Sequence, residues 1–197
     1  MTLTFWDEKF SGEEYLYGIV PNKFFQQSID KIKPGSLLIP GDGEGRNSLY
    51  AAKLGWNVYA FDSSKRGREK ALQLASDNKV KIEYEISDYL SFKSSEKFDA
   101  IVLVFSHLPS TERQEVHRKY AGMLNPGGRI ILQTFSKEQL GMNSGGPKNL
   151  DMLFSVEELK EDFNTLTTIS VENTIVELDE GPLHQGKAHV IEFIGIK

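Results

Sequence analysis

Short apolar segments alternate with amphipathic segments along the chain as far as residue 135. The apolar segments are predicted strands, and they occupy residues 36–39, 57–61, 81–86, 100–104 and 129–135. The segments between them have helical periodicity, at residues 46–54, 64–76 and 110–124. Because strand and helix alternate, we expect right-handed crossovers and a parallel sheet with helices on both faces.

The pattern changes after residue 135. A glycine-rich loop at 141–147 precedes a short helix, which a capping box of Ser155 and Glu158 opens. Two long β segments follow, at 167–178 and 188–196, and the connection between them favours an antiparallel hairpin. The last segment is apolar on both faces, so we expect it to lie inside the sheet, antiparallel to the fifth strand. The predicted fold is α/β and doubly wound, with five parallel strands and a C-terminal hairpin.

Composition narrows the class of protein. The 197 residues fit one domain, divided into an N-terminal arm (1–33), a core (34–135) and a C-terminal part (136–197). A net charge of −5 argues against a nucleic-acid partner, and the lack of cysteine excludes disulfides and thiolate metal sites. The longest apolar run, 100–105, is too short for a membrane span, and the first residues lack a signal-peptide pattern. We therefore expect a cytoplasmic protein without a membrane partner, in an oligomeric state that the sequence leaves open.

The N-terminal arm is rich in aromatic residues. Pro21 and Asn22 precede an amphipathic helix start that contains Phe24, Phe25 and Ile29. Before it come four large rings, those of Trp6, Phe10, Tyr15 and Tyr17. These rings either pack as additional core or form a lid over a ligand, and we predict the lid.

A glycine turn follows the first strand and opens the first helix. Gly41, Gly43 and Gly45 allow a tight turn and a close approach of ligand to backbone, and the helix N-terminus offers free N–H groups. Asp62 ends the second strand, 21 positions after Gly41, where a carboxylate can accept hydrogen bonds from ribose hydroxyls. The alternative for Asp62 is a helix cap. Together the turn and the acid predict a nucleotide-type cofactor site.

Further polar and aromatic residues end the third and fourth strands. Asp88 and Tyr89 follow the third strand, where the carboxylate either accepts from an adenine amino group or caps a turn. Phe105 and His107 follow the fourth strand, at the edge where open α/β sheets hold ligands. His107 is either a polar group of the cleft or a partner of a turn carbonyl. The four histidines have no metal-ligand spacing, and Gly-x-Ser-x-Gly is absent, so we expect no metal and no serine nucleophile.

These motifs together resemble the class I S-adenosylmethionine-dependent methyltransferases, in the branch with the tellurite-resistance and thiopurine-methyltransferase-like proteins. The narrower likeness rests on Tyr15-x-Tyr17-Gly18-x-x-Pro21-Asn22, Gly43-Glu44-Gly45-Arg46-Asn47, His107-Leu108-Pro109, Leu124-Asn125-Pro126-Gly127-Gly128 and Glu180-Gly181-x-x-His184-x-Gly186. It covers essentially the whole chain, and it implies a Rossmann-like seven-stranded sheet with a reversed last strand.

The resemblance also implies roles for individual residues. The methionine part of S-adenosylmethionine would lie on the turn, the ribose on Asp62 and the adenine on Asp88 and Tyr89, with Phe105 beneath the sulfonium. The cofactor-binding residues it implies are Gly41, Asp42, Gly43, Gly45, Asn47, Asp62, Ser63, Asp88, Tyr89 and Phe105. One position departs from the family: Ile39 stands where an acid is frequent, and Asp42 lies inside the turn instead.

The expected reaction is methyl transfer to a small molecule, such as a thiol or a chalcogen oxyanion. Its catalytic candidates are His184, His107 and Tyr17, with Glu177 or Glu180 able to fix the tautomer of His184. A solvated loop is the alternative for His184. A nicotinamide-dependent oxidoreductase is one rival function, although Arg46 replaces the third glycine of its fingerprint. A binding protein for S-adenosylmethionine without turnover, acting as a sensor, is the other.

Overall fold

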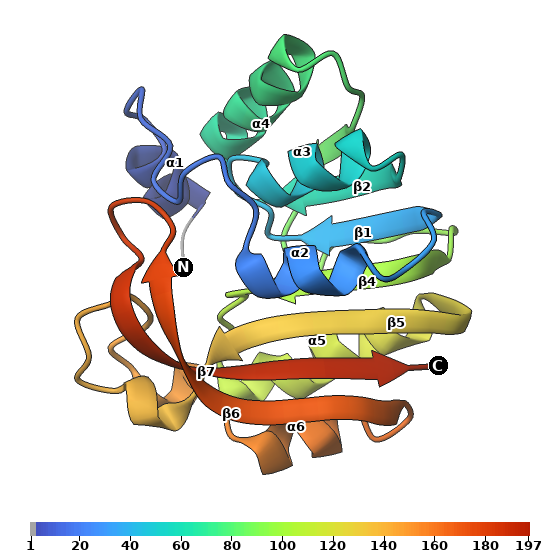
Figure 1. Cartoon of the computed structure of the whole chain (residues 1–197), viewed down its shortest axis with the longest axis vertical. Coiled ribbons are helices and arrows are strands. Elements are labelled where there is room, and N and C mark those ends of the chain that lie inside the picture. Colours follow the sequence, from blue (N-terminus) through green and yellow to red (C-terminus); the bar gives the residue numbers. More distant parts are fainter. Residues whose placement is uncertain (1–2) are drawn as a thin grey trace.

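The computed structural model describes residues 3–197. The helices are α1 (Leu3–Lys9), α2 (Lys23–Ile29), α3 (Arg46–Lys53), α4 (Lys65–Asp77), α5 (Ser110–Gly122) and α6 (Val156–Asp162), with short 3-10 turns at Lys137–Gln139 and Leu150–Met152. The strands are β1 (Ser36–Pro40), β2 (Asn57–Asp62), β3 (Glu83–Ile86), β4 (Phe98–Val104), β5 (Leu124–Phe135), β6 (Thr167–Asp179) and β7 (Gln185–Ile196). Figure 1 shows how they are arranged around a central sheet.

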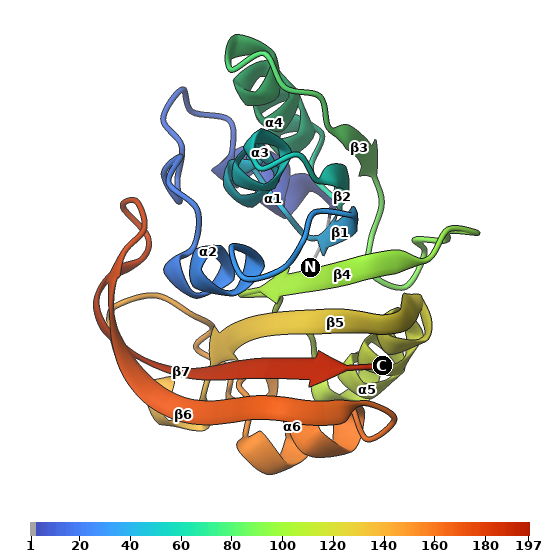
Figure 2. The ribbon, with the colours of Figure 1, turned by 45° about the vertical axis from the view of Figure 1, so that its right-hand side comes forward.

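The seven strands form one sheet in the order β3-β2-β1-β4-β5-β7-β6. Neighbours among β1 to β5 pair in parallel, whereas β7 pairs antiparallel with both β5 and β6. The last strand therefore lies between β5 and β6, which Figure 2 shows clearly. This arrangement confirms the predicted fold, including the inserted, reversed last strand.

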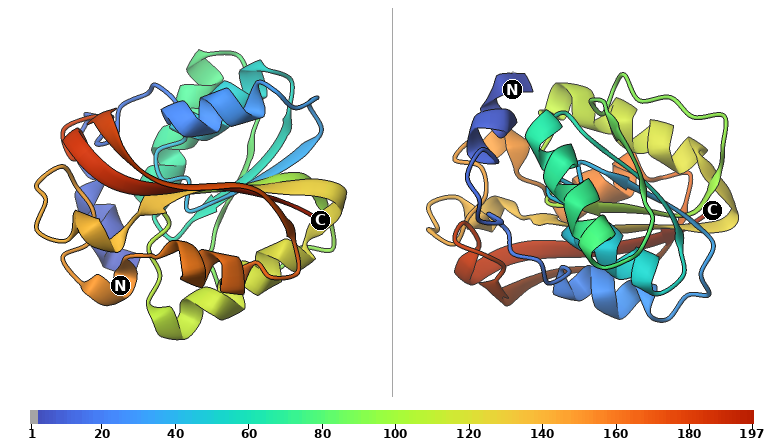
Figure 3. Two further views of the ribbon diagram at one scale, coloured as in Figure 1. Left: turned by 60° about the horizontal axis from the view of Figure 1, so that its bottom comes forward. Right: turned by 90° about the horizontal axis from the view of Figure 1, so that it is seen from above.

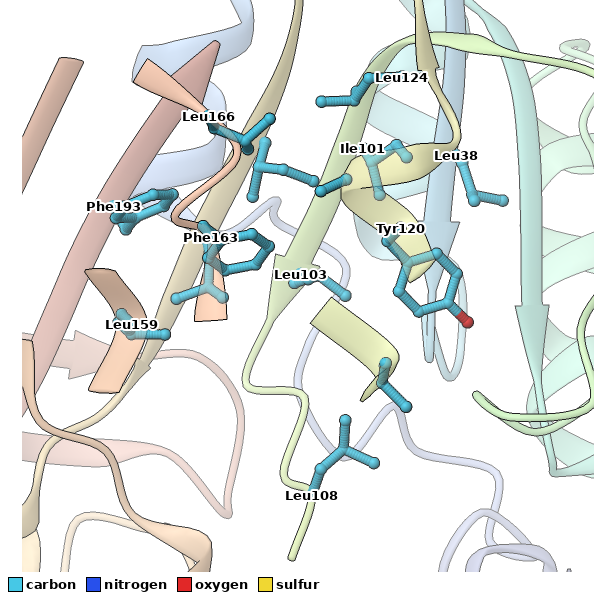
Figure 4. Close-up of a cluster of buried hydrophobic side chains, with 14 of the residues drawn as sticks. Leu38, Ile101, Leu103, Leu108, Tyr120, Leu124, Leu159, Phe163, Leu166 and Phe193 are labelled. Atoms are coloured by element: carbon cyan, nitrogen blue, oxygen red, sulfur yellow. The ribbon is translucent and has the colours of Figure 1, made fainter. Parts of the chain in front are cut away.

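Helices cover both faces of the sheet, and alternate strand residues supply the two cores. On one face α2, α3 and α4 pack against side chains such as Leu37 and Ile39, and on the other α5 and α6 pack against Leu38 (Figure 3). Figure 4 shows the second core, in which Phe163 and Phe193 lie beside Leu159 and Leu166. Because each face is buried, the central strands are continuously apolar rather than alternating.

Three details differ from the sequence prediction. The arm begins with a helix, α1, that the sequence pattern does not indicate, because its seven residues are too few to show a period. Strand β3 begins at Glu83 instead of residue 81, and β5 begins at Leu124 because the pairing with β4 continues through a bulge. Within residues 3–197, no helix is both long enough and apolar enough to cross a membrane.

Candidate functional site

The glycine turn is fastened to the carboxyl end of β2. The backbone N–H groups of Gly41 and Asp42 both donate to the carbonyl oxygen of Phe61, at 2.8 and 3.2 Å. Gly43 has a φ of +61°, and its N–H donates to Oδ2 of Asp62 at 3.1 Å. The turn and the predicted ribose-binding acid are therefore in direct contact, although nineteen positions separate them along the chain.

Asp62 is buried and links the turn to helix α4. Its second oxygen, Oδ1, accepts from the N–H of Ser64 at 2.8 Å. The cap of α4 is Ser64 itself, whose hydroxyl accepts from the N–H of Gly67, so Asp62 is not the helix cap. Ser63 lies between them at the same strand end. Burial raises the pKa of Asp62, against the lowering effect of these backbone donors.

Asp42 is the second acid of the turn, and it is only 9% exposed. Its Oδ2 accepts from the hydroxyl of Ser48 at 2.5 Å, whereas its Oδ1 is buried and has no hydrogen-bond partner among the described residues. Burial raises the pKa of Asp42 to about 7, and the nearby charge of Asp62 adds to the rise. The side chain of Asn47, in contrast, binds the N-terminal arm, because its Oδ1 accepts a hydrogen bond from the N–H of Asn22 at 3.0 Å.

The two residues predicted for adenine lie differently. Asp88 is exposed, and its Oδ1 accepts from the N–H groups of Leu90 and Ser91 at 2.9 and 2.7 Å, so it caps a turn. Tyr89 is partly buried, and its hydroxyl lies against Gly41 so closely that a Cβ there would collide with it. The structure therefore brings Tyr89, but not the side chain of Asp88, to the glycine turn.

Five aromatic rings gather at the carboxyl ends of β4 and β5, and we call them the five-ring cluster: Tyr17, Phe105, His107, Phe135 and His184. Phe105 stacks on Phe135 with ring centroids 4.5 Å apart, and the ring of His107 stacks on Phe135 at 5.5 Å. His184 meets Phe105 and Tyr17 edge-on, each at 4.7 Å. Phe105 itself has a φ of +50°, a left-handed conformation that a bulky residue seldom adopts outside functional sites.

The two histidines of the cluster are neutral near pH 7. Burial lowers the pKa of His107 to about 3, and the neighbouring His184 lowers it further. Burial likewise lowers the pKa of His184, which is 5% exposed, although Glu180 opposes the shift. The Nδ1 atoms of both rings are buried without a hydrogen-bond partner within residues 3–197. His107 is therefore not satisfied by a turn carbonyl through Nδ1, and His184 does not lie in a solvated loop.

Glu180, rather than Glu177, is the carboxylate beside His184. Its Oε2 is 3.6 Å from Nδ1 of His184 and 2.7 Å from the guanidinium of Arg46. His184 and Arg46 both lower the pKa of Glu180, which falls to about 2 although burial opposes the shift. Glu177 is exposed and lies opposite Lys187 on the neighbouring strand. Burial raises the pKa of the remaining candidate, Tyr17, to about 12, so its phenol keeps its proton.

A buried polar network joins the arm, helix α3 and the hairpin loop. Arg46 also donates to the carbonyl oxygen of Tyr17 at 3.1 Å. The amide of Asn22 donates to Gln133 at 2.6 Å and to Glu180 at 2.8 Å. Gly181 has a φ of +74°, and a Cβ on it would overlap the arm backbone. Sequence reasoning missed this network of Asn22, Gln133 and Arg46, because the side chains that it joins lie at least 111 positions apart along the chain.

The arm itself lies across the glycine turn. Phe10 is buried with its ring over Gly43, and Asp7 accepts from Ser64 Oγ at 2.7 Å and from the N–H of Arg66 at 3.0 Å. Glu44 of the turn accepts from the N–H of Leu16 at 2.8 Å. These contacts hold the arm against the glycine turn and the start of helix α4.

Parts of this chain are similar in sequence to known proteins. Residues 38–128 match the family described as a methyltransferase domain. Over 115 residues the chain is 30% identical to the tRNA (uracil(54)-C(5))-methyltransferase of Pyrococcus abyssi, a match that covers 49% of this chain and 28% of that protein. The chain thus spans well under half the length of this curated relative.

Two solved structures have the same fold. TehB from Haemophilus influenzae superposes with a TM-score of 0.76 at 19% identity, over 98% of this chain and 66% of that one. The N-methyltransferase NodS from Bradyrhizobium japonicum, in complex with S-adenosylhomocysteine, superposes with a TM-score of 0.74 at 14% identity, over 99% and 97%. Together with the family match, these likenesses confirm the resemblance drawn from the motifs. Residues 38–128 match a methyltransferase domain, and the chain as a whole has the fold of the class I methyltransferases.

Proposed function

We propose that this protein transfers a methyl group from S-adenosylmethionine to an uncharged small molecule, with a soft nucleophile such as a thiol as the favoured acceptor. The observation that carries the proposal is the contact between the glycine turn and Asp62, beside a cluster of aromatic rings at the same edge of the sheet. This arrangement supports a nucleotide-type ligand next to an apolar reaction site. A cytoplasmic location remains part of the proposal.

The residues at the turn fit the cofactor. Asp42 presents a buried carboxylate oxygen that has no partner among the described residues, and Asp62 has acceptor capacity beyond its two backbone bonds. Gly43 carries no side chain on the side that faces Phe10 of the arm. Tyr89 lies against Gly41, at the start of the turn. When bound, the cofactor supplies a methyl group that its sulfonium already activates. The protein then contributes mainly orientation and exclusion of water.

The five-ring cluster supports the acceptor side of the reaction. Neutral His184 is positioned to take the proton of a thiol or amine as the acceptor's lone pair forms the new bond to carbon. The carboxylate of Glu180, 3.6 Å from Nδ1, stabilises the imidazolium that results. Tyr17 keeps its phenol proton, and its ring contacts the ring of His184. We therefore propose that Tyr17 positions His184.

Charge favours an uncharged acceptor over an oxyanion. The cations of the described residues nearest to the cluster and the turn are already paired, Arg46 with Glu180 at 2.7 Å and Lys70 with Glu44 at 2.6 Å. Both histidines of the cluster are neutral. A buried oxyanion would therefore lose its hydration without gaining a free positive charge from the side chains of the protein. A chalcogen oxyanion is the second candidate, and it rests on the branch resemblance.

An RNA acceptor is the alternative that the Pyrococcus relative raises, since that protein is named for a tRNA substrate. The net charge of −5 opposes it, because binding to a phosphate backbone requires an excess of Lys and Arg on one surface. A nicotinamide cofactor is opposed by Arg46, which is buried in an ion pair at the place of the third glycine.

The test is a screen for S-adenosylhomocysteine release over thiol, amine, carboxylate, selenite and tellurite acceptors, with transfer RNA as a further arm. We expect turnover with uncharged thiols, and slower turnover or none with the oxyanions. Turnover with RNA alone would refute the small-molecule proposal. Binding of the cofactor without turnover on any acceptor would favour the sensor.

A further inference from the structure

The imidazole ring of His184 is enclosed by its neighbours, and the residue is only 5% exposed. The rings of Tyr17 and Phe105 contact it with centroids 4.7 Å away, and the ring of Phe135 does so at 5.4 Å. Oε2 of Glu180 lies 3.6 Å from Nδ1. This carboxylate favours the tautomer that carries its proton on Nδ1, so Nε2 is the nitrogen that can take a proton from an acceptor.

The edge of the ring that carries Nε2 faces the glycine-rich loop 141–147, which lies beside the hairpin of β6 and β7 in Figure 1. A Cβ on Gly145 would lie 2.6 Å from Cδ2 of His184 and 3.2 Å from its Nε2. The same Cβ would lie 2.9 Å from the carbonyl oxygen of Leu183. Any side chain at position 145 would therefore occupy the space directly beside Nε2.

Buried hydrogen bonds hold the loop in this position. Nε2 of Gln139 donates to Oγ of Ser144 at 2.9 Å and to the carbonyl oxygen of Gly145 at 3.0 Å. Two further bonds tie these side chains to the backbone of β7, one from Oγ of Ser144 at 2.6 Å and one to Oε1 of Gln139 at 2.8 Å. Both side chains are buried. Because the loop is fixed, a Cβ on Gly145 would displace the Leu183–His184 segment instead of the loop.

The packing of the five-ring cluster limits the size of an acceptor. Phe105 and Phe135 stack with centroids 4.5 Å apart, and both contact the ring of His184. Rings at these separations are in van der Waals contact, so they leave no space between them for a bulky molecule. On the neighbouring side, a Cβ on Gly146 would lie 2.8 Å from the ring of Phe135. The backbone of the loop is thus close to two rings of the cluster, and it bears no side chain there.

We propose that Gly145 determines the specificity of methyl transfer, because it reserves the space beside Nε2 of His184 for a compact acceptor such as a short-chain alkyl thiol. The inference rests on the proposed function, whose acceptor it narrows by size. The absent side chain leaves the nitrogen accessible, and the rings of Phe105 and Phe135 exclude bulkier thiols. Gly145 touches neither the glycine turn nor Asp62, so its effect is confined to the acceptor.

A series of thiols that are uncharged near pH 7 and differ in bulk tests the size limit on the wild-type protein. Release of S-adenosylhomocysteine is measured with methanethiol, ethanethiol and cyclohexanethiol. We expect kcat/KM to be at least about 10-fold lower for cyclohexanethiol than for ethanethiol, the scale on which an apolar pocket discriminates by size. A value for cyclohexanethiol equal to or above that for ethanethiol would overturn the inference without any variant.

The variant Gly145→Ala adds one methyl group beside Nε2. We expect kcat/KM for ethanethiol to fall about 10–200-fold and that for methanethiol to fall less, while the affinity for S-adenosylhomocysteine, measured by calorimetry, stays near wild type. Gly141→Ala is the matched control, because Gly141 lies in the same loop with a φ of +90°, but a Cβ on it would meet nothing within 4 Å. That variant should keep the wild-type values.

The outcomes separate a specificity role from a structural one. A merely structural role of Gly145 would lower kcat/KM equally for methanethiol and ethanethiol, or would affect Gly141→Ala as well, and either result would overturn the inference. Should Gly145→Ala fail to fold, the wild-type series decides the question alone. Turnover of none of the three thiols by the wild type would instead refute the proposed function, and the inference with it.

Discussion

The glycine turn and Asp62 come from one crossover of the chain, residues 41–62, whereas the five-ring cluster takes its members from positions 17, 105, 107, 135 and 184. The first region is held by backbone hydrogen bonds to a neighbouring strand. The second depends on the arm, two strand ends and the hairpin loop meeting in space. A site formed by one segment can be recognised from the spacing of its residues in the sequence. A site assembled from distant segments shows no such spacing, because its residues are isolated from one another along the chain.

The largest effect on cofactor binding should come from Gly43→Val, which alters the glycine turn itself. Valine at a φ of +61° adds backbone strain of about 1–3 kcal/mol. Its side chain also meets Phe10, which lies 3.3 Å from a Cβ there, and overpacking adds about 1–3 kcal/mol. We expect cofactor binding, measured by calorimetry, to be lost.

Gly55→Val is the matched control, because Gly55 also has a positive φ of +89° but open space around its Cα. That variant should bear similar backbone strain and still bind the cofactor. Normal binding by Gly43→Val would mean that the cofactor site is misplaced.

The next effect concerns the assembled region. His184→Ala should lower the methyl-transfer rate by roughly 10²–10⁴-fold, the contribution of a positioned general base, while cofactor affinity stays near wild type. His189→Ala, five positions along the same hairpin, should leave both quantities unchanged. A rate for His184→Ala within about threefold of wild type would remove His184 from the chemistry.

A smaller effect, on stability, is expected from Glu180→Gln. This substitution removes the ion pair of Glu180 with Arg46, which joins the two regions. Leaving Arg46 buried without its carboxylate should cost about 3 kcal/mol of unfolding free energy near pH 7. The pKa of Glu180 is lowered from 4.5 to about 2, so this stability is present above pH 4.5 and is lost as the pH falls toward 2.

Urea unfolding at several pH values measures this difference. The exposed Glu177→Gln is the control and should change little. The account of the network would be wrong if Glu180→Gln matched the wild type at pH 7, or if the difference persisted undiminished at pH 2.5.

The smallest effect should be in the arm. Because Phe10 is already buried over Gly43, binding of S-adenosylhomocysteine should add only modest protection from hydrogen exchange at residues 5–20. Exchange rates that do not change there would favour fixed packing over a lid.

The same contrast explains how much the sequence could predict. The five parallel strands and the inserted last strand were predicted from apolar patterning, since β7 is buried on both faces. The contact of Asp62 with Gly43 was foreseeable from spacing. The pairing of Arg46 with Glu180 was not, because 134 positions separate them and only the folded sheet brings them together. Asp88 shows the converse: its position at a strand end fitted a ligand role, yet local backbone donors occupy its carboxylate.

The most direct test of the central claim is a calorimetric comparison of S-adenosylmethionine and NADH on the wild-type protein. The turn holds Arg46 in a buried ion pair where a dinucleotide fingerprint has its third glycine, and the five-ring cluster lies beside it. We predict saturable binding of S-adenosylmethionine and no detectable binding of NADH. Binding of NADH without S-adenosylmethionine would contradict the assignment of this site.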